Sequence, residues 1–344
     1  HRQGQKSRAA IEKSRETIAK LLQVDAKEII FTSGGAESNN LILKGALKVN
    51  ESKGKHLITS KIEHSTVLKT CQALEKEGYE VTYIDVTERG VIDPEQLKNA
   101  IRNDTVAISV MYVNNETGVV QPIDEIAKMI EGKGIVLHTD AIQGVGKEMI
   151  LPKKQGIHAL SAAAHKFYGP KGTGFLYLDQ NYMIEKEITG GSQERNRRSG
   201  TENVHGIVGM AKALEIVYSD MEEEQAKEKE MQIYLEEALK EEICNIKINC
   251  GNSRRISSVV NITLEDCNVQ TLMVALDMEG ICVSGGSACM SGAMETSHVL
   301  KAMGASEEDL KSSIRVSIGR YNTKDEIDIF IQKLKEIVAR ERAK

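Results

Sequence analysis

Short apolar runs alternate with amphipathic stretches between residues 28 and 178, and this alternation constrains the fold more than any other feature. Six runs have the length and composition of buried strands: residues 28–33, 56–60, 80–86, 106–113, 136–139 and 174–178. Helical periodicity occurs between some of them, at residues 65–77, 94–102 and 123–133. Strand, helix, strand order is typical of a mostly parallel sheet with helices on both faces, so we predict an α/β fold.

The pattern changes after about residue 207, where the regular alternation ends. The charged stretch DMEEEQAKEKEMQIYLEEALKEE, which starts at Asp220, predicts one long exposed helix whose acidic side is solvated. We therefore place a domain boundary near residue 220. It divides the chain into a large domain, residues 1–220, and a smaller C-terminal α/β domain, residues 221–344.

The smaller domain contains further signals for strands and helices. The segment RRISSVVNITL, residues 254–264, predicts a strand, and residues 268–278 predict a helix. A last helix is expected over residues 323–343, because Thr323 and Glu326 have the spacing of a capping box.

The composition argues against several classes of function. The chain has 344 residues, 28% of them charged, and a net charge of −5, which does not favour binding to nucleic acid or to an anionic membrane surface. No apolar run reaches the roughly 18 residues of a membrane helix, and we identify no signal peptide. The six cysteines form no CxxC pair, so we expect no disulfide framework, no metal site and a cytoplasmic protein. Because the first residues after His1 already have a helical pattern, we expect an N-terminal segment to be absent.

Lys166 lies in the segment SAAAHKFYGPKG, after three alanines and a histidine and before a Gly-Pro turn. Lysine is rarely buried, because removing an ammonium group from water is costly unless the group is paired or neutralised. In a sheltered site the pKa of a lysine falls, and the neutral amine can attack a carbonyl carbon to form a Schiff base. From this segment alone, a surface lysine on a loop is an equal alternative.

Three other motifs follow predicted strands, at the edge where open α/β sheets bind ligands. In FTSGGAESNN, Gly34 and Gly35 precede a helix whose first N–H groups could bind phosphate, although a plain turn fits as well. In HTDAIQGVGK, Asp140 could pair with a protonated heterocycle nitrogen or cap a helix. In TSKIEHSTVL, His64 could stack on a flat ring, shuttle protons or act as a capping residue.

Cys289 lies in VSGGSACMSGAMETSHVL, a stretch rich in Ser and Gly whose composition suits a mobile loop. A cysteine in such a stretch is a candidate nucleophile, because reactivity requires exposure and thiolate character. Most cysteines are buried and inert, so this stretch alone leaves both interpretations open. The other cysteines lie in helix or strand patterns and are expected to be packing residues: Cys71, Cys244, Cys250, Cys267 and Cys282.

Taken together, these segments resemble the cysteine desulfurases of the NifS/IscS type, which are pyridoxal-phosphate enzymes of the class V aminotransferase family and of aminotransferase fold type I. The motifs that carry the resemblance extend along nearly the whole chain: FTSGGAESNN, TSKIEHSTV, MYVNNETGVVQPI, HTDAIQGVGK, AHKFYGPKGTGFLYL, ERNRRSGTENV, GSACMSG and SSIRVSIGR. The GSAC motif in a long Ser/Gly stretch is similar to the branch of the family with an extended cysteine loop. The resemblance implies a large cofactor-binding domain and a smaller C-terminal domain.

The resemblance also implies roles around the cofactor, pyridoxal 5'-phosphate. Lys166 would hold the cofactor as a Schiff base and then move protons at the substrate α-carbon. Asp140 would pair with the pyridine nitrogen and keep it protonated, so that the ring acts as an electron sink. Gln143 would form a hydrogen bond with the phenolate oxygen, and His64 would stack on the ring and assist proton transfer.

Other residues would bind the substrate and the cofactor phosphate. Arg315 would clamp the substrate carboxylate with its bidentate fork, and Asn115 would contact the cofactor or that carboxylate. The resemblance places four residues at a phosphate: Gly35, Ala36, His165 and Thr201. Thr201 would reach the phosphate of the neighbouring subunit, which implies an obligate homodimer.

The implied reaction converts L-cysteine to L-alanine, with Cys289, Lys166 and His64 as the catalytic residues. The thiolate of Cys289 would attack the substrate sulfur and become a persulfide. Family members deliver this sulfur to an iron–sulfur scaffold protein or to a sulfur-carrier protein. The resemblance implies no direct contact with nucleic acid or with a membrane.

Two positions depart from the family pattern. Ala36 stands where the family usually has Thr, and Ala163 stands where it usually has Ser, so two phosphate-binding hydroxyl groups are missing. A hydrogen bond to a charged group is worth about 1.5–3 kcal/mol, so we expect a weakly held cofactor. Two alternatives stay open. One is a lyase-like enzyme for selenocysteine or another β-substituted amino acid, and the other is a catalytically weakened paralogue that serves as a binding platform.

Overall fold

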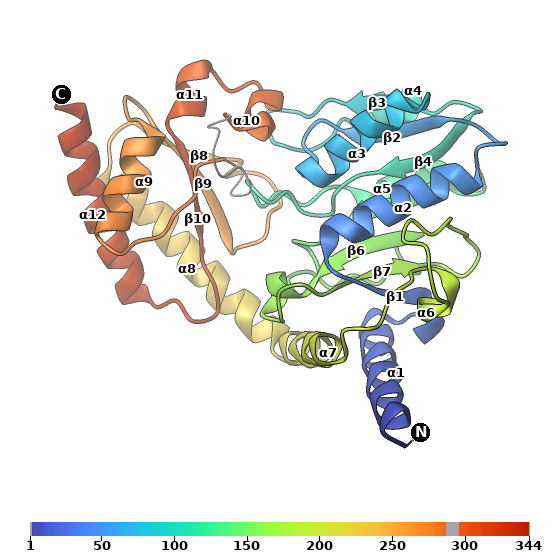
Figure 1. Ribbon diagram of the computed structural model, residues 1–344. Helices are drawn as coiled ribbons and strands as arrows, with labels where there is room; N and C mark the ends of the chain where they lie inside the picture. Colours follow the sequence, from blue (N-terminus) through green and yellow to red (C-terminus); the bar gives the residue numbers. More distant parts are fainter. Residues whose placement is uncertain (1, 287–295, 344) are drawn as a thin grey trace. The chain divides into compact units, whose positions relative to one another are not determined.

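The computed structural model describes residues 2–286 and 296–343, which belong to two compact units (Figure 1). Unit 1 consists of His1–Asp85, Ile92–Val113 and Gln121–Met221, and unit 2 consists of Val86–Val91, Asn114–Val120 and Glu222–Lys344. The division predicted at residue 220 assigns Val86–Val91 and Asn114–Val120 to the large domain, whereas in the structure these two short segments belong to unit 2.

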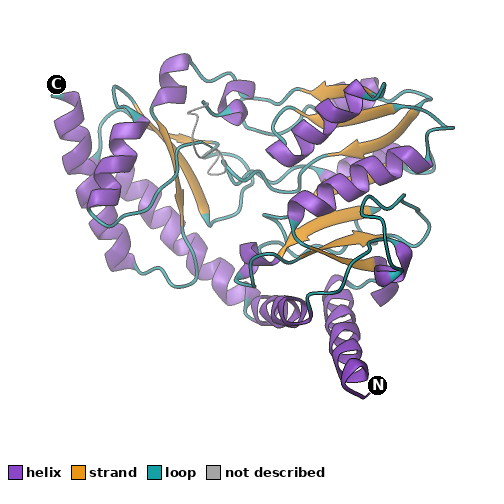
Figure 2. Ribbon diagram, in the orientation of Figure 1, coloured by secondary structure: helices purple, strands orange, loops and turns teal. Residues whose placement is uncertain are grey.

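Unit 1 is built on a seven-stranded sheet with the strand order β1-β7-β6-β5-β4-β2-β3. Its strands are β1 (Ile29–Thr32), β2 (His56–Ser60), β3 (Glu80–Ile84), β4 (Thr105–Ser109), β5 (Val136–Asp140), β6 (Ala159–Ala163) and β7 (Gly174–Leu178). The strands from β3 to β6 in this order run parallel, whereas β7 is antiparallel to both of its neighbours (Figure 2). The mostly parallel sheet confirms the predicted fold class.

One strand of this sheet, β6, was not expected from the apolar pattern. Its sequence, ALSAA, contains no β-branched or aromatic side chain and therefore lacks a strand signal. All five residues are nevertheless buried, and the register pairs Ser161 with Asp140 of β5. The small side chains leave room for α2 (Gly35–Val49), which packs over β6 and its neighbours.

The other helices of unit 1 complete its layers. They are α1 (Arg2–Leu22), α3 (Ser65–Lys76), α4 (Pro94–Ala100), α5 (Ile123–Ile130), α6 (Gln193–Asn196) and α7 (Val204–Ser219), with 3-10 turns η1 (Ala26–Glu28) and η2 (Ala164–Phe167). The helices predicted near 65–77, 94–102 and 123–133 are present as α3, α4 and α5. The core face of α2 is formed by long aliphatic side chains: Leu41, Ile42, Leu43 and Leu47.

Unit 2 contains a three-stranded antiparallel sheet with the order β10-β9-β8. Its elements are β8 (Ile246–Asn249), β9 (Val259–Leu264), β10 (Ser313–Ser317), α8 (Met221–Glu242), α9 (Val269–Met278), α10 (His298–Ala302), α11 (Glu307–Lys311) and α12 (Lys324–Arg342). The strand and the helix predicted at 254–264 and 268–278 are present as β9 and α9. The capping box is confirmed at α12, where Glu326 N donates to Thr323 Oγ1 and Thr323 N donates to Glu326 Oε2.

The helix α8 was predicted to be exposed along its length, and this prediction is wrong for one of its faces. Met231, Leu235 and Leu239 are at most 7% exposed and lie in the core of unit 2. Their four-residue spacing puts them on one side of the helix. Because most of the other residues in this segment are charged, its composition alone does not reveal the apolar stripe. Among the described helices, none has both the length and the apolar content that crossing a bilayer requires.

Leu235→Ala is expected to lower the free energy of unfolding by about 2–5 kcal/mol, because it leaves a cavity at a fully buried position in the core of unit 2. Ile233→Ala is the matched control, since Ile233 lies on the same helix and is 44% exposed, and it should cost about 1 kcal/mol or less. Urea unfolding followed by circular dichroism measures both values. Equal losses in the two variants would contradict a buried stripe on α8.

Candidate active site

The carboxyl end of β5 places an acidic side chain in the interior of unit 1. Asp140 is the last residue of β5 and is only 4% exposed. Its Oδ2 accepts a 2.7 Å hydrogen bond from Nδ2 of Asn39 on α2, and its Oδ1 accepts a 3.1 Å hydrogen bond from the backbone N of Ile142. These two donors fix the carboxylate at the edge of the sheet where open α/β folds bind ligands.

Asp140 also forms an electrostatic group with two basic side chains. Burial raises the pKa of Asp140 above its ordinary range, while the hydrogen bond from Asn39 and the positive charges of His64 and Lys166 oppose this effect. His64 follows β2 and Lys166 follows β6, and both strands run parallel to β5 in the sheet, so the three side chains belong to the same end of the sheet. A cation bound beside Asp140, such as a protonated ring nitrogen, would be stabilised by this buried carboxylate.

His64 is the N-cap residue of α3. Its Nδ1 accepts a 3.2 Å hydrogen bond from Thr66 N and lies 2.8 Å from Thr66 Oγ1, so the neutral ring carries its proton on Nε2. Thr66 Oγ1 also accepts a 2.9 Å hydrogen bond from Asn39, which thereby connects the histidine to Asp140. The capping role left open by the sequence is therefore present, while ring stacking by His64 stays a prediction.

Two polar side chains that the sequence patterns did not single out organise this edge of the sheet. One is Asn39, and the other is Glu63, which is fully buried. Glu63 Oε1 accepts hydrogen bonds from Ser60 Oγ at 2.5 Å and from Met111 N at 3.0 Å, and burial raises the pKa of Glu63 to about 8. Both residues lie inside the motifs quoted above, but the burial that makes them important is not visible in the sequence.

Lys166 lies in η2, the short turn that follows β6, and is half-buried. A 2.9 Å hydrogen bond from Gly169 N to Ala164 O closes this turn. A Cβ atom on Gly169 would lie 2.9 Å from the Cβ of Ala164, so the tight return of the chain requires glycine here. Because β5 and β6 are parallel neighbours, the turn places Lys166 at the same edge of the sheet as Asp140.

The start of α2 packs against the loop that follows β5. A Cβ on Gly35 would lie only 2.0 Å from Cδ1 of Ile142, so a larger residue here would displace the Ile142 side chain. Ala36 is exposed in the first turn of the helix, and Ala163 is buried at the end of β6, 3.9 Å from the same Cβ position. The two positions expected to lack phosphate-binding hydroxyl groups are therefore both close to Gly35.

His165 and Gln143 are two further residues of unit 1 that are predicted to lie around the cofactor. Partial burial and the positive charges of Lys166 and Lys171 lower the pKa of His165. Gln143 is 9% exposed, and its Oε1 accepts a 2.7 Å hydrogen bond from Lys147 Nζ. Its Nε2 is consequently the group suited to donate a hydrogen bond to an oxygen of a bound molecule.

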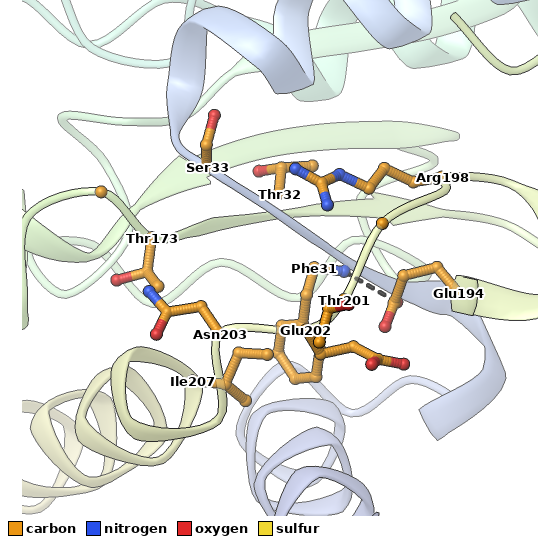
Figure 3. Close-up of a pocket in the computed structure, with 12 residues that line it drawn as sticks. Phe31, Thr32, Ser33, Thr173, Glu194, Arg198, Thr201, Glu202, Asn203 and Ile207 are labelled. Carbon is orange, nitrogen blue, oxygen red and sulfur yellow. Dashed lines mark hydrogen bonds between the residues drawn. The ribbon is translucent and has the colours of Figure 1, made fainter. Parts of the chain in front are cut away.

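Thr201 lines a cavity of about 110 Å³ in unit 1. Four hydroxyl side chains contribute to its wall: Thr32, Ser33, Thr173 and Thr201 (Figure 3). Arg198 also lines the cavity, and its Nε pairs with Glu37 Oε1 at 2.7 Å. The resemblance implied a phosphate-binding role for Thr201 but none for Arg198, which lies in the same ERNRRSGTENV motif.

A buried ion pair holds one wall of this cavity. Glu194 accepts a 2.9 Å hydrogen bond from Phe31 N, the dashed line in Figure 3, and pairs with Arg15 at 2.7 Å. Glu194, Arg195 and Asn196 have φ values of 46°, 56° and 65°, which residues other than glycine rarely adopt. The ion pair with Arg15 therefore fixes a strained turn shortly before Thr201.

Unit 2 brings together the two predicted substrate-binding residues. In β10, Arg315 Nη1 donates a 2.8 Å hydrogen bond to Asn115 O, and Nη2 donates a 3.3 Å hydrogen bond to Ser284 Oγ. The contact thus uses the backbone carbonyl of Asn115 rather than its side-chain amide. The predicted nucleophile, Cys289, lies outside the described residues.

The groups in unit 1 fit pyridoxal phosphate. An amine, a buried carboxylate and an imidazole, from Lys166, Asp140 and His64, belong to one edge of the sheet. The buried Oδ1 of Asn39 has no hydrogen-bond partner among the described residues, so this edge retains an acceptor for a bound group. Within residues 2–286 and 296–343, no group of three or more His, Cys, Asp or Glu side chains is placed to hold a metal ion.

Comparisons with known proteins agree with this chemistry. The Aminotransferase class-V family matches residues 1–330. A protein of Dictyoglomus turgidum named cysteine desulfurase IscS is 43% identical over 342 residues, which cover 99% of this chain and 87% of that protein.

Solved structures extend the similarity to the fold. A NifS-like protein superposes with a TM-score of 0.93 at 35% identity, over 98% of this chain and 90% of the other. A structure described as SspA in complex with cysteine superposes with a TM-score of 0.82 at 37% identity, over 94% and 90%. The present chain therefore belongs to the class-V aminotransferase family and, within it, to the pyridoxal-phosphate-dependent cysteine desulfurases of the NifS/IscS type.

Proposed function

We propose that the protein is a cysteine desulfurase that converts L-cysteine to L-alanine and leaves the sulfur as a persulfide on Cys289. The observation that carries this proposal is the electrostatic group of Lys166, Asp140 and His64 at one edge of the unit 1 sheet. An amine that can bind a carbonyl, beside a carboxylate that can stabilise a cationic ring nitrogen, suits the activation of amino acids. The name of the Dictyoglomus turgidum relative and the cysteine in the SspA structure support L-cysteine as the substrate.

The residues of unit 1 bind the cofactor and move protons. The chemistry that bound pyridoxal phosphate supplies is an aldehyde for the amine and a ring that withdraws electron density from the substrate α-carbon. Lys166 would hold the cofactor through its aldehyde carbon and would move the proton at the substrate Cα. Asp140, fixed by Asn39, would keep a proton on the ring nitrogen, and Gln143 would donate to the ring oxygen. His64 assists proton transfer through Nε2, the atom that carries its proton in the neutral ring.

Residues of unit 2 bind the substrate and accept its sulfur. Arg315 binds the substrate carboxylate through two parallel N–H groups, and Asn115 contributes its side-chain amide. The Cys289 thiolate attacks the substrate sulfur, so that an S–S bond forms and the Cβ–S bond breaks. The electron pair of the broken bond stays with the carbon fragment, which takes up a proton and leaves as alanine. Cysteine and a thiol thus give alanine and a persulfide, without an external oxidant.

The proposal extends to the assembly and the sulfur acceptor. A homodimer would let Thr201 reach the phosphate of the neighbouring subunit, and the hydroxyl-rich cavity around Thr201 supports this role. The IscS name of the relatives supports an iron–sulfur scaffold protein or a sulfur-carrier protein as the acceptor. A cytoplasmic location agrees with the cysteines of the described residues, which are all free thiols.

Lys166→Ala is expected to abolish alanine formation from L-cysteine, because it removes the amine that holds the cofactor aldehyde. Lys171→Ala is the matched control, since Lys171 is an exposed lysine of the same segment, and it should retain activity. Borohydride reduction after incubation with pyridoxal phosphate, followed by peptide mapping, should place the label on Lys166. A label on another lysine would refute the assignment.

Ala36→Thr and Ala163→Ser are each expected to raise the affinity for pyridoxal phosphate about 10- to 150-fold, the equivalent of one hydrogen bond of about 1.5–3 kcal/mol to a charged group. Ala9→Thr on α1 is the control, because Ala9 is also an exposed helical alanine. Equilibrium dialysis with absorbance detection measures the affinity. Wild-type protein that keeps its full cofactor content through exhaustive dialysis would contradict weak retention.

Cys289→Ala is expected to retain cofactor binding while it loses both the persulfide and alanine formation from L-cysteine, because no thiol remains to accept sulfur. Cys282→Ala serves as the control, since Cys282 is an exposed free cysteine; the expectation that Cys282 and Cys244 are packing residues is wrong, because both are exposed. Mass spectrometry detects the persulfide, and an alanine assay measures turnover. Alanine formation that persists in Cys289→Ala would instead favour an enzyme without sulfur relay, such as one acting on selenocysteine.

A further inference from the structure

Two side chains on neighbouring strands hold the segment Asn114–Val120 against the sheet of unit 2. Asn261 of β9 and Arg315 of β10 are cross-strand partners. Asn261 Nδ2 donates a 3.1 Å hydrogen bond to Glu116 O, and Arg315 Nη1 donates a 2.8 Å hydrogen bond to Asn115 O. The sheet therefore fixes the backbone carbonyl groups of Asn115 and Glu116. The first is held by Arg315, the residue proposed to bind the substrate carboxylate.

The side chain of Glu116 extends this connection to a helix start. Glu116 is fully buried, and its Oε2 accepts a 2.5 Å hydrogen bond from Ser297 Oγ. Ser297 is the N-cap of α10, where its Oγ accepts a 3.0 Å hydrogen bond from Leu300 N. The second carboxylate oxygen of Glu116, Oε1, is buried and has no hydrogen-bond partner among the described residues. Burying such a group is costly, and an apolar side chain would serve packing better, so its presence points to a function.

Ser297 and Ser284 flank the part of the sequence that contains Cys289. Ser284 forms a backbone bridge with Arg315, through hydrogen bonds of 3.1 Å from Ser284 N and 2.6 Å from Arg315 N. A Cβ built on Gly286 would lie 3.7 Å from Ser297 N, so residues on the two sides of this part of the chain are neighbours. Ser284 contacts Arg315 directly. Ser297 is connected to Arg315 indirectly, because Ser297 binds the Glu116 carboxylate and Arg315 binds the carbonyl of the preceding residue, Asn115.

We propose that Glu116 is a positioning residue for sulfur transfer. Its carboxylate binds Ser297, which follows Cys289 in the sequence. The residue before Glu116, Asn115, is bound in turn by Arg315 through its backbone carbonyl. The inference rests on the proposed function, in which Arg315 binds the substrate carboxylate and Cys289 receives the sulfur. Attack of one sulfur atom on another requires a defined approach, and a misplacement of about 1 Å can lower such a rate on the order of a hundredfold.

The experiment compares variants of the cofactor-loaded protein in a single turnover with L-cysteine. Glu116→Ala should slow persulfide formation on Cys289 at least about tenfold at saturating cysteine, while the affinity for L-alanine changes less than about twofold. Glu116→Gln should recover most of the rate, because its Oε1 can still accept the hydrogen bond from Ser297. The persulfide is measured by mass spectrometry, and L-alanine binding by the change in cofactor absorbance.

Serine variants separate positioning from helix capping. Ser297→Ala removes the contact with Glu116 together with the cap of α10, and it should slow persulfide formation as Glu116→Ala does. Ser306→Ala removes the cap of α11, where Ser306 Oγ accepts from Asp309 N without reaching Glu116, and it should behave as the wild type. If Glu116→Ala does not fold, Ser297→Ala with its Ser306→Ala control carries the test.

The outcomes distinguish this inference from the proposed function. Wild-type protein that forms neither alanine nor persulfide refutes the proposed function and the inference with it. If the wild type forms persulfide and Glu116→Ala and Ser297→Ala form it equally fast, Glu116 has no positioning role. The positioning role is also refuted if Glu116→Ala loses as much L-alanine affinity as it loses rate of persulfide formation. It is likewise refuted if Glu116→Gln forms persulfide as slowly as Glu116→Ala.

Discussion

The hydrogen bond from Asn39 to Asp140 is the interaction on which the organisation of unit 1 depends. It joins α2 to the end of β5 and stabilises the charge of a carboxylate whose pKa burial would otherwise raise further. The same amide donates to Thr66 and so connects the N-cap histidine His64 to the group. One buried side chain therefore fixes an acid and a base at the edge of the sheet that also carries Lys166, and such preorganisation is what proton transfer at an amino acid requires.

This contact is possible because small residues let α2 approach the sheet closely. Gly35 leaves space for Ile142, and a Cβ on Gly174 would lie 2.7 Å from the Cα of Gly34. The alanines of β6 have the same effect under the helix. The small side chains that leave β6 without a strand signal are thus a condition for the site. In unit 2, side chains also fix a segment that is distant in the sequence: Asn261 and Arg315 bind backbone carbonyls of the segment Asn114–Val120.

Most of the fold and part of the candidate site are predictable from the sequence, whereas short strands and buried polar residues are not. The strands of unit 1 with branched apolar side chains were predicted, as was β9, whereas β6, β8 and β10 were not predicted as strands and the apolar stripe of α8 was misjudged. The residues with recognisable chemistry, such as Lys166 and Asp140, were identified because their side chains are unusual for their surroundings. Asn39 and Glu116 were not, because an asparagine or a glutamate is ordinary on a surface and becomes significant only when it is buried.

The sequence by itself determined the α/β class, because strand and helix periodicities are local properties of the chain. It also determined which reactive groups the chain contains, including the amine of Lys166 and the thiol of Cys289. Only the tertiary structure decided which polar groups are buried, which hydrogen bonds they form with one another, and where small residues permit close packing. The physical reason is that desolvation and hydrogen bonding at one residue depend on segments distant in the sequence, as when α2 covers the end of β5.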